Sequence, residues 1–160
     1  MLVHCRVDER VIHGQTTTKI TKETHVDGII IVDDKISTDQ FMVQLYKQIL
    51  PPSIKVHTFS VDKAFSKLPE AEKSQKSYVV IFKTPLTIKK LVEQGYKFNG
   101  TLFIGPQSVR EGSTFIMQMI GLLPEEMEAL DFLEQQGLNV ILNPTFTTPN
   151  LTWNMAKSQI

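Results

Sequence analysis

The ten residues from Arg6 to Gln15 contain a dense group of side chains that can take part in chemistry. They hold two arginines, two acids, a histidine, a glycine and an amide: Arg6, Asp8, Glu9, Arg10, His13, Gly14 and Gln15. Histidine is the side chain whose ordinary pKa leaves it neutral and nucleophilic near pH 7, and a neutral ring nitrogen can attack phosphorus to form a phosphoramidate. The sequence therefore offers His13 as a carrier of a phosphoryl group.

The neighbours of His13 suit that chemistry. Arg10 could place a permanently charged, two-pronged donor beside the phosphoryl oxygens, and Asp8 could orient Arg10 or fix the imidazole tautomer. Gly14 lets the backbone approach closely, and a helix that begins at about Gln15 would direct its free amides at the same anion. The residue types alone leave a structural histidine and a surface ion-pair cluster open as alternatives.

Short apolar runs alternate with amphipathic stretches along the chain, which is typical of a parallel sheet wrapped by helices. The predicted strands are Leu2 to Val7, Gly28 to Asp33, Ile54 to Phe59, Tyr78 to Phe82, Thr101 to Ile104 and Leu138 to Leu142. The predicted helices are Gln15 to Thr24, Thr38 to Leu50, Val61 to Lys73, Thr87 to Gln94, Glu125 to Gln136 and Leu151 to Lys157. The sequence predicts one α/β domain over residues 1–160, an open, twisted, mostly parallel sheet with helices on both faces.

Prolines and glycines punctuate this pattern. Pro69 predicts a break in the helix that starts at Val61, because a proline inside a helix removes a hydrogen bond. Gly95 and Gly137 are predicted to end helices in the left-handed conformation. The polar segment from Gly105 to Thr114 predicts a loop or hairpin, followed by a strand at Phe115 to Met119.

In an open parallel sheet, ligands bind beyond the carboxyl ends of the strands. This places the Arg6 to Gln15 segment beside the loops that follow the fourth and fifth strands. Lys83, Thr84 and Arg110 lie in those loops. Together with Arg6 and Arg10 they form a predicted rim around His13, which is basic apart from Thr84.

Composition excludes several classes of protein. The 17 lysines and arginines balance the 17 aspartates and glutamates, so the broad basic field of a nucleic-acid-binding protein is absent. The single cysteine, Cys5, allows no internal disulfide, and the sequence shows no Cys/His cluster for zinc. No segment approaches the ~20 apolar residues of a membrane span. These features predict a cytoplasmic protein with no metal and no cofactor.

The segment from Arg6 to Gln15 closely resembles a known family motif, Arg-(Ile/Val)-Asp-(Asp/Glu)-Arg-(Leu/Val)-Ile-His-Gly-Gln. This motif belongs to the mannose/fructose/sorbose family of phosphotransferase-system (PTS) IIB proteins, and all ten positions agree. Chain length and several other segments are also similar: Lys22-Glu23-Thr24, Leu50-Pro51-Pro52, and Gly105 followed by Arg110 and Gly112. The chain departs from the family at Thr16-Thr17-Thr18 and at Gly105-Pro106, which bears on the identity of partner and sugar.

The resemblance implies a function for this chain. In the family, the motif histidine accepts phosphate from a phosphohistidine of the IIA protein and passes it to a sugar at the membrane subunits IIC and IID. His13 would then be the phosphohistidine of a protein-N(π)-phosphohistidine–sugar phosphotransferase, with Arg10 contacting the phosphate and Asp8 assisting. The expected location is the cytoplasmic face of the membrane, reached through IIC and IID, and a homodimer stays open.

Two other classes of function remain at this stage. A regulatory or sensory module of the same fold would carry the phosphate without feeding a transporter. A flavodoxin-like or nucleotide-binding domain would need a cofactor, but neither GxxxxGK[ST] nor GxGxxG occurs in the sequence. The sugar itself is not specified by the sequence.

Overall fold

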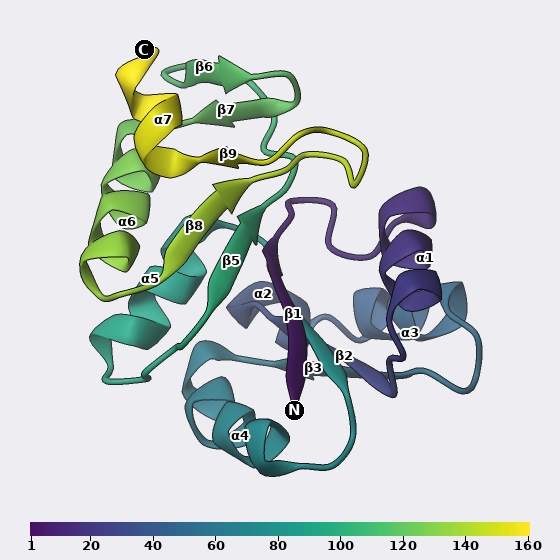
Figure 1. The fold of residues 1–160 in the computed structure, drawn as a ribbon. Coiled ribbons are helices and arrows are strands. Elements are labelled where there is room, and N and C mark those ends of the chain that lie inside the picture. Colours follow the sequence, from purple (N-terminus) through teal and green to yellow (C-terminus); the bar gives the residue numbers. More distant parts are fainter.

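A seven-stranded sheet forms the centre of the molecule in the computed structural model, which describes residues 1–160 except for the side chains of Gln15 and Thr16. The strand order is β3-β2-β4-β1-β5-β8-β9, and the pairing is parallel everywhere except between β8 and β9 (Figure 1). The strands are β1 Leu2–Val7, β2 Gly28–Val32, β3 Lys55–Phe59, β4 Tyr78–Phe82, β5 Thr101–Ile104, β8 Asn139–Leu142 and β9 Leu151–Thr152. The predicted open α/β architecture is confirmed.

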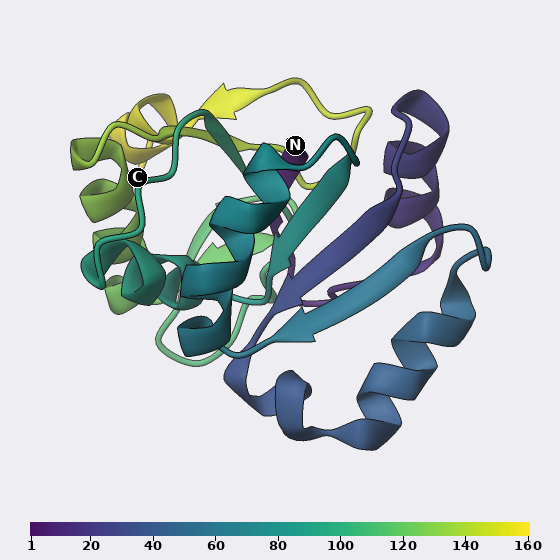
Figure 2. The same cartoon turned by 90° about the horizontal axis from the view of Figure 1, so that it is seen from below.

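Helices cover both faces of this sheet, as the sequence predicts (Figure 2). They are α1 Gly14–Glu23, α2 Asp34–Thr38, α3 Gln40–Ile49, α4 Val61–Lys73, α5 Pro85–Glu93, α6 Pro124–Gln135 and α7 Trp153–Ser158. One core cluster joins α4, α5, α6 and α7 to the sheet. A second core cluster joins α1, α2 and α3 to residues of β2, β3 and β4.

The side chains of β1 alternate between the two faces of the sheet. Cys5 and Val7 point into the first core cluster, so His4 and Arg6 point to the other face. The second cluster includes side chains of β2, β3 and β4 but none of β5 or β8 among the described residues. The helices on that face therefore cover only part of the sheet, and His4 and Arg6 lie toward the uncovered part.

Two details of the elements differ from the sequence prediction. The helix α4 runs through Pro69 without the predicted break. The hydrogen bond that the proline removes falls at Phe65, which is exposed, and the buried side chains of Ala64 and Leu68 anchor the helix on both sides of that gap. The predicted helix from Thr38 to Leu50 corresponds to α3, which begins at Gln40 because Asp39 caps it, and a short helix that the sequence did not predict, α2, precedes it with Asp33 as its cap.

The segment after β5 forms a separate antiparallel hairpin. Its strands are β6 Thr114–Met117 and β7 Ile120–Leu122, with Met119 in a left-handed conformation at the turn. The sequence predicts a strand from Phe115 to Met119, whereas β6 ends at Met117 and the turn follows. Gly95 and Gly137 have φ values of 103° and 96°, so both predicted left-handed helix ends are confirmed.

Candidate active site

The loop between β1 and α1 lies at the carboxyl edge of the sheet. The amide of Asp8 donates to the carbonyl of Phe82 at the end of β4, and the amide of Glu9 donates to the carbonyl of Pro106 after β5. The amide of Val11 donates to the carbonyl of Asp8 and closes a tight turn. The loop is thus attached to the ends of both neighbouring strands, which fixes its position.

Two apolar residues hold this loop against the protein. Val11 and Ile12 are 1% and 3% exposed and belong to the second core cluster. Val11 has a φ of 60°, a left-handed conformation that a β-branched residue rarely adopts. Burial of the two side chains offsets this strain, and the resulting turn brings His13 back toward Asp8.

The carboxylate of Asp8 is the centre of the site. It is 1% exposed, and its Oδ2 lies 3.1 Å from Nε2 of His13. Its Oδ1 accepts a hydrogen bond of 3.0 Å from the backbone amide of Arg10. The Nε atoms of Arg6 and Arg10 lie 3.5 and 3.7 Å from the same carboxylate. One buried acid therefore connects the three side chains that the sequence singled out.

This geometry determines which nitrogen of His13 can react. An ionised carboxylate only accepts hydrogen bonds, so Nε2 carries the proton that it donates to Asp8. The neutral ring then has its lone pair on Nδ1. In this arrangement Nδ1 is the ring nitrogen that could act as a nucleophile.

His13 keeps 19% of its side-chain surface exposed, because its ring lies against Asp8. It is the N-cap residue of α1, and the first turn of that helix contains no acidic residue. The amides at a helix N-terminus attract anions. Gly14 is exposed, and a Cβ atom added there would meet no atom within 4 Å, so space is open beside the helix start.

The arginines of the motif occupy different environments. Arg10 has 41% of its side chain exposed and can turn toward a bound anion. Arg6 is only 1% exposed, so its assignment to the solvent-facing rim was wrong. The reason is its strand position, since residue 6 points to the face opposite Val7, where the centroid of the Phe146 ring lies 5.1 Å from the guanidinium carbon.

The other predicted rim residues are placed as follows. Lys83 is exposed and follows Phe82, whose carbonyl binds the amide of Asp8, so it lies at the same edge as the loop. Thr84 uses its hydroxyl to cap α5 through the amide of Leu86. Arg110 pairs with the buried Glu126 at the start of α6. The predicted contact of Gln15 falls on a side chain outside the described residues.

Sequence reasoning missed the residues that join the loops together. Gln107 is 2% exposed, and its side-chain amide donates to the carbonyls of Lys83 and Pro106. Ser108 donates to Glu9. A buried glutamine after a strand carries no local signal for this role, because its two partners come from separate loops.

The part of the chain that the structure describes lacks two classes of feature. No group of three or more His, Cys, Asp or Glu residues there could hold a metal ion. No helix there is both long enough and apolar enough to cross a bilayer.

Fold and site together define a parallel α/β domain that presents a carboxylate-oriented histidine at the N-terminus of its first helix. Residues 2–153 match the family model for the PTS system sorbose subfamily IIB component. The chain therefore belongs to the sorbose subfamily of PTS IIB components. It is a sugar-specific IIB component of the phosphotransferase system, and such components are transferases.

Individual relatives agree with this assignment. The chain is 32% identical over 145 residues to the PTS system sorbose-specific EIIB component of Lacticaseibacillus casei, covering 91% of this chain and 88% of that protein. It is 30% identical over 146 residues to the PTS system mannose-specific EIIAB component of Escherichia coli (strain K12). That match covers 91% of this chain but 45% of the relative, so the chain spans about half the length of this relative.

A solved structure confirms the fold. The IIBSor domain of the sorbose permease from Klebsiella pneumoniae superposes with a TM-score of 0.90 at 26% identity. The superposition covers 99% of this chain and 97% of that domain. The predicted family and the predicted fold class are both confirmed.

Proposed function

We propose that this chain accepts a phosphoryl group from a phosphohistidine of a IIA protein or domain on Nδ1 of His13 and donates it to a sugar. The observation that carries the proposal is the contact between Asp8 Oδ2 and His13 Nε2, which leaves the lone pair on Nδ1. The reaction class is that of a protein-N(π)-phosphohistidine–sugar phosphotransferase.

Each half-reaction exchanges one bond to phosphorus. In the first, Nδ1 of His13 attacks the phosphorus, and the bond to the donor imidazole breaks with its electron pair leaving on that ring. In the second, a sugar hydroxyl attacks, the bond from phosphorus to Nδ1 breaks, and the leaving ring takes up a proton as the hydroxyl loses one. Arg10 and the first amides of α1 stabilise the charge on the phosphoryl oxygens in both.

The partners follow from the family. Phospho-IIA supplies the phosphate, and the membrane subunits IIC and IID present the sugar, so the chain would work at the cytoplasmic face of the membrane. The similar proteins are named for mannose, sorbose, fructose and N-acetylgalactosamine. The proposal is therefore that the acceptor is a sugar, without specifying which one.

Two substitutions test the proposal. His13→Ala should abolish labelling by phospho-IIA while the melting temperature changes little, because the partly exposed side chain contributes little to the core. Arg10→Lys keeps the charge but loses the planar fork, so transfer should slow by ~10- to 1000-fold. Labelling would be measured by mass mapping of the modified peptide, with acid lability and base stability as the signs of a phosphoramidate.

Undiminished labelling of His13→Ala would overturn the assignment. Sugar phosphorylation by membranes that contain IIC and IID separates a transport component from a regulatory module of the same fold. A regulatory module would be labelled by phospho-IIA but would transfer no phosphate to sugar.

A further inference from the structure

Buried polar atoms that lack a partner are concentrated at one place in this molecule. Among the described side chains, four such nitrogen or oxygen atoms make no hydrogen bond: His4 Nε2, Arg6 Nε, Arg6 Nη1 and Asn143 Oδ1. All three residues line the same cavity of about 470 Å³. Because an unpartnered buried polar atom is costly, such a cluster indicates groups that await a ligand.

The cavity lies on the part of the sheet that α1, α2 and α3 leave uncovered. Its floor consists of His4 and Arg6 from β1 and Phe103 from β5, and its sides are the end of α1 and the segment 143–150 between β8 and β9. In Figure 1, this segment is the yellow loop between β8 and β9. The cavity is thus separate from the N-terminus of α1, where His13 lies.

The walls combine ring surfaces with hydrogen-bonding groups. The rings of His4 and Phe103 stack with centroids 4.8 Å apart, and Phe146 lies under the guanidinium of Arg6. Burial, together with the nearby Arg6 cation, lowers the pKa of His4 to about 4, so its ring is neutral near pH 7. Ring surfaces of this kind contact the C–H groups of a sugar, and the polar atoms can then bind its hydroxyls.

The charged and polar groups of the cavity indicate the remaining chemistry of the ligand. Arg6 is a fixed cation that shares the carboxylate of Asp8 with Arg10 and His13 at distances of 3.5, 3.7 and 3.1 Å. Its Nε is the atom that faces Asp8, whereas its Nη1 donates no hydrogen bond. An oxyanion would satisfy Nη1. Asn143 Oδ1 and the exposed carboxylate of Glu23 accept hydrogen bonds, so the same ligand needs hydroxyl groups.

We infer that this cavity is a second ligand site, one that binds a phosphorylated sugar such as a hexose phosphate. The oxyanion pairs with Arg6, the hydroxyls meet Asn143 and Glu23, and the ring lies against Phe103 and Phe146. The unpartnered atoms have almost no exposed surface, so binding includes a shift of segment 143–150, whose Pro144 carbonyl accepts from Arg6 Nη2 at 3.2 Å. Since Arg6 also contacts Asp8, an occupied cavity would act on the support of His13.

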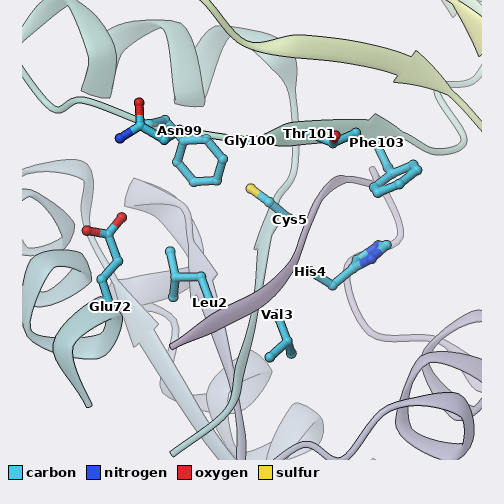
Figure 3. Close-up of a pocket in the computed structure, with 10 residues that line it drawn as sticks. Leu2, Val3, His4, Cys5, Glu72, Asn99, Gly100, Thr101 and Phe103 are labelled. Atoms are coloured by element: carbon cyan, nitrogen blue, oxygen red, sulfur yellow. The ribbon is translucent and has the colours of Figure 1, made fainter. Parts of the chain in front are cut away.

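A neighbouring cavity offers fewer groups that could bind a ligand. It has a volume of about 370 Å³ and shares His4 and Phe103, whose rings lie side by side in Figure 3. Its remaining walls include Cys5 and Glu72. Burial raises the pKa of the Cys5 thiol, and Glu72 accepts from the hydroxyl of Tyr96, so these groups offer a ligand little. The unpartnered atoms therefore favour the larger cavity.

Titration of the isotope-labelled protein with glucose 6-phosphate, followed by NMR, tests the inference. We expect saturable shifts of the amides of His4, Phe103 and segment 143–150. Glucose alone and inorganic phosphate alone should each bind at least tenfold more weakly, because each supplies only part of the contacts. Shifts confined to the His13 loop, equal binding of inorganic phosphate, or no saturation would each overturn the second site.

Charge variants at exposed cavity residues supply the controls without disturbing the core. Glu23→Gln replaces a carboxylate acceptor of the sugar hydroxyls by a weaker amide acceptor, and Thr24→Glu adds a negative charge near the oxyanion, so each should weaken binding roughly three- to tenfold. Glu128→Gln, the same change on an exposed residue of α6, should leave the affinity unchanged. His13→Ala should also bind normally, which keeps this test independent of phosphoryl transfer. Equal affinity of all four variants would contradict the proposal.

Discussion

At the scale of single residues, the site depends on one buried carboxylate. Asp8 contacts His13, Arg6 and Arg10, and these three side chains differ in exposure from 1% to 41%. A shared acid can hold a neutral histidine in one tautomer and keep a buried arginine charged at the same time. The loop therefore combines a structural ion pair with a reactive group in ten residues.

Asp8→Asn should damage both roles. An amide can donate to Nε2 of His13 and so favour the wrong tautomer, which should slow phosphoryl transfer by ~100- to 10,000-fold. The same change leaves Arg6 buried without a carboxylate, which should cost about 3 to 5 kcal/mol of unfolding free energy. Initial rates with phospho-IIA and urea unfolding measure the two effects.

The matched control for this experiment is Glu9→Gln. Glu9 belongs to the same loop, and its carboxylate accepts a hydrogen bond from the Ser108 hydroxyl. This variant should retain most of the transfer rate and the stability. If Glu9→Gln were as slow as Asp8→Asn, the change of loop charge and not the tautomer would explain the result.

His4 makes the free energy of unfolding depend on pH in the acidic range. Its pKa is about 4 in the folded protein and near 6.5 when unfolded, so the unfolded state binds more protons between these values. The contribution of neutral His4 to the unfolding free energy is fully present above pH 6.5. It is lost as the pH falls toward 4, by up to about 3 kcal/mol. His4→Phe keeps a ring against Phe103 and should flatten this part of the profile, as measured by urea unfolding at pH 7, 6, 5 and 4.5. If the difference in unfolding free energy between the wild type and His4→Phe stayed constant over this pH range, His4 would not be the source of the pH dependence.

At the scale of elements, the start of the β5–β6 connection makes room for Arg6. A Cβ atom on Gly105 would lie 2.7 Å from Arg6 Nη2 and 2.8 Å from Nε. Such distances are far below contact, and Arg6 is too buried to turn into water. The glycine after β5 and the arginine of β1 therefore form one packing unit behind the active-site loop.

Gly105→Ala should displace the Arg6 guanidinium and its contact with Asp8. We expect a loss of about 1 to 3 kcal/mol of unfolding free energy and slower phosphorylation of His13. Gly14→Ala is the control for stability, because nothing lies within 4 Å of the added atom, and it should melt within a few degrees of the wild type. Equal stability of Gly105→Ala and the wild type would show that Arg6 has another position available.

At the scale of the whole molecule, a net charge of zero leaves recognition of partners to local surfaces. Arg10 and Lys83 are exposed at the carboxyl edge of the sheet, and both are positive. We propose that they attract an acidic or polar face of the IIA partner. Arg110 contributes less to this positive surface than its position in the sequence indicated, because its charge is paired with that of Glu126.

Transfer from phospho-IIA should therefore slow as salt is added. Lys83→Glu should lower the rate at low ionic strength and weaken its dependence on salt. Lys73→Glu, at the last turn of α4, makes the same charge change far from the proposed contact and should leave the rate unchanged. A wild-type rate that stays constant from low to high ionic strength would contradict electrostatic steering.

The sequence by itself determined the sheet, most of the helices and the identity of the reactive loop. Apolar runs such as Gly28–Val32 and Tyr78–Phe82 are too short and too continuous for surface helices, so their local pattern specifies buried strands. The residue types around His13 likewise indicated phosphoryl chemistry, because the side chains that suit this chemistry are neighbours in the sequence.

Only the tertiary structure decided which atoms meet. Arg6 is buried because Gly105, Pro144 and Phe146, about 100 and 140 residues away, enclose its guanidinium. The tautomer of His13 follows from an Asp8 contact that the turn at Val11 creates. Local sequence patterns report which face a side chain takes, whereas its burial and partners depend on segments brought together by long-range packing.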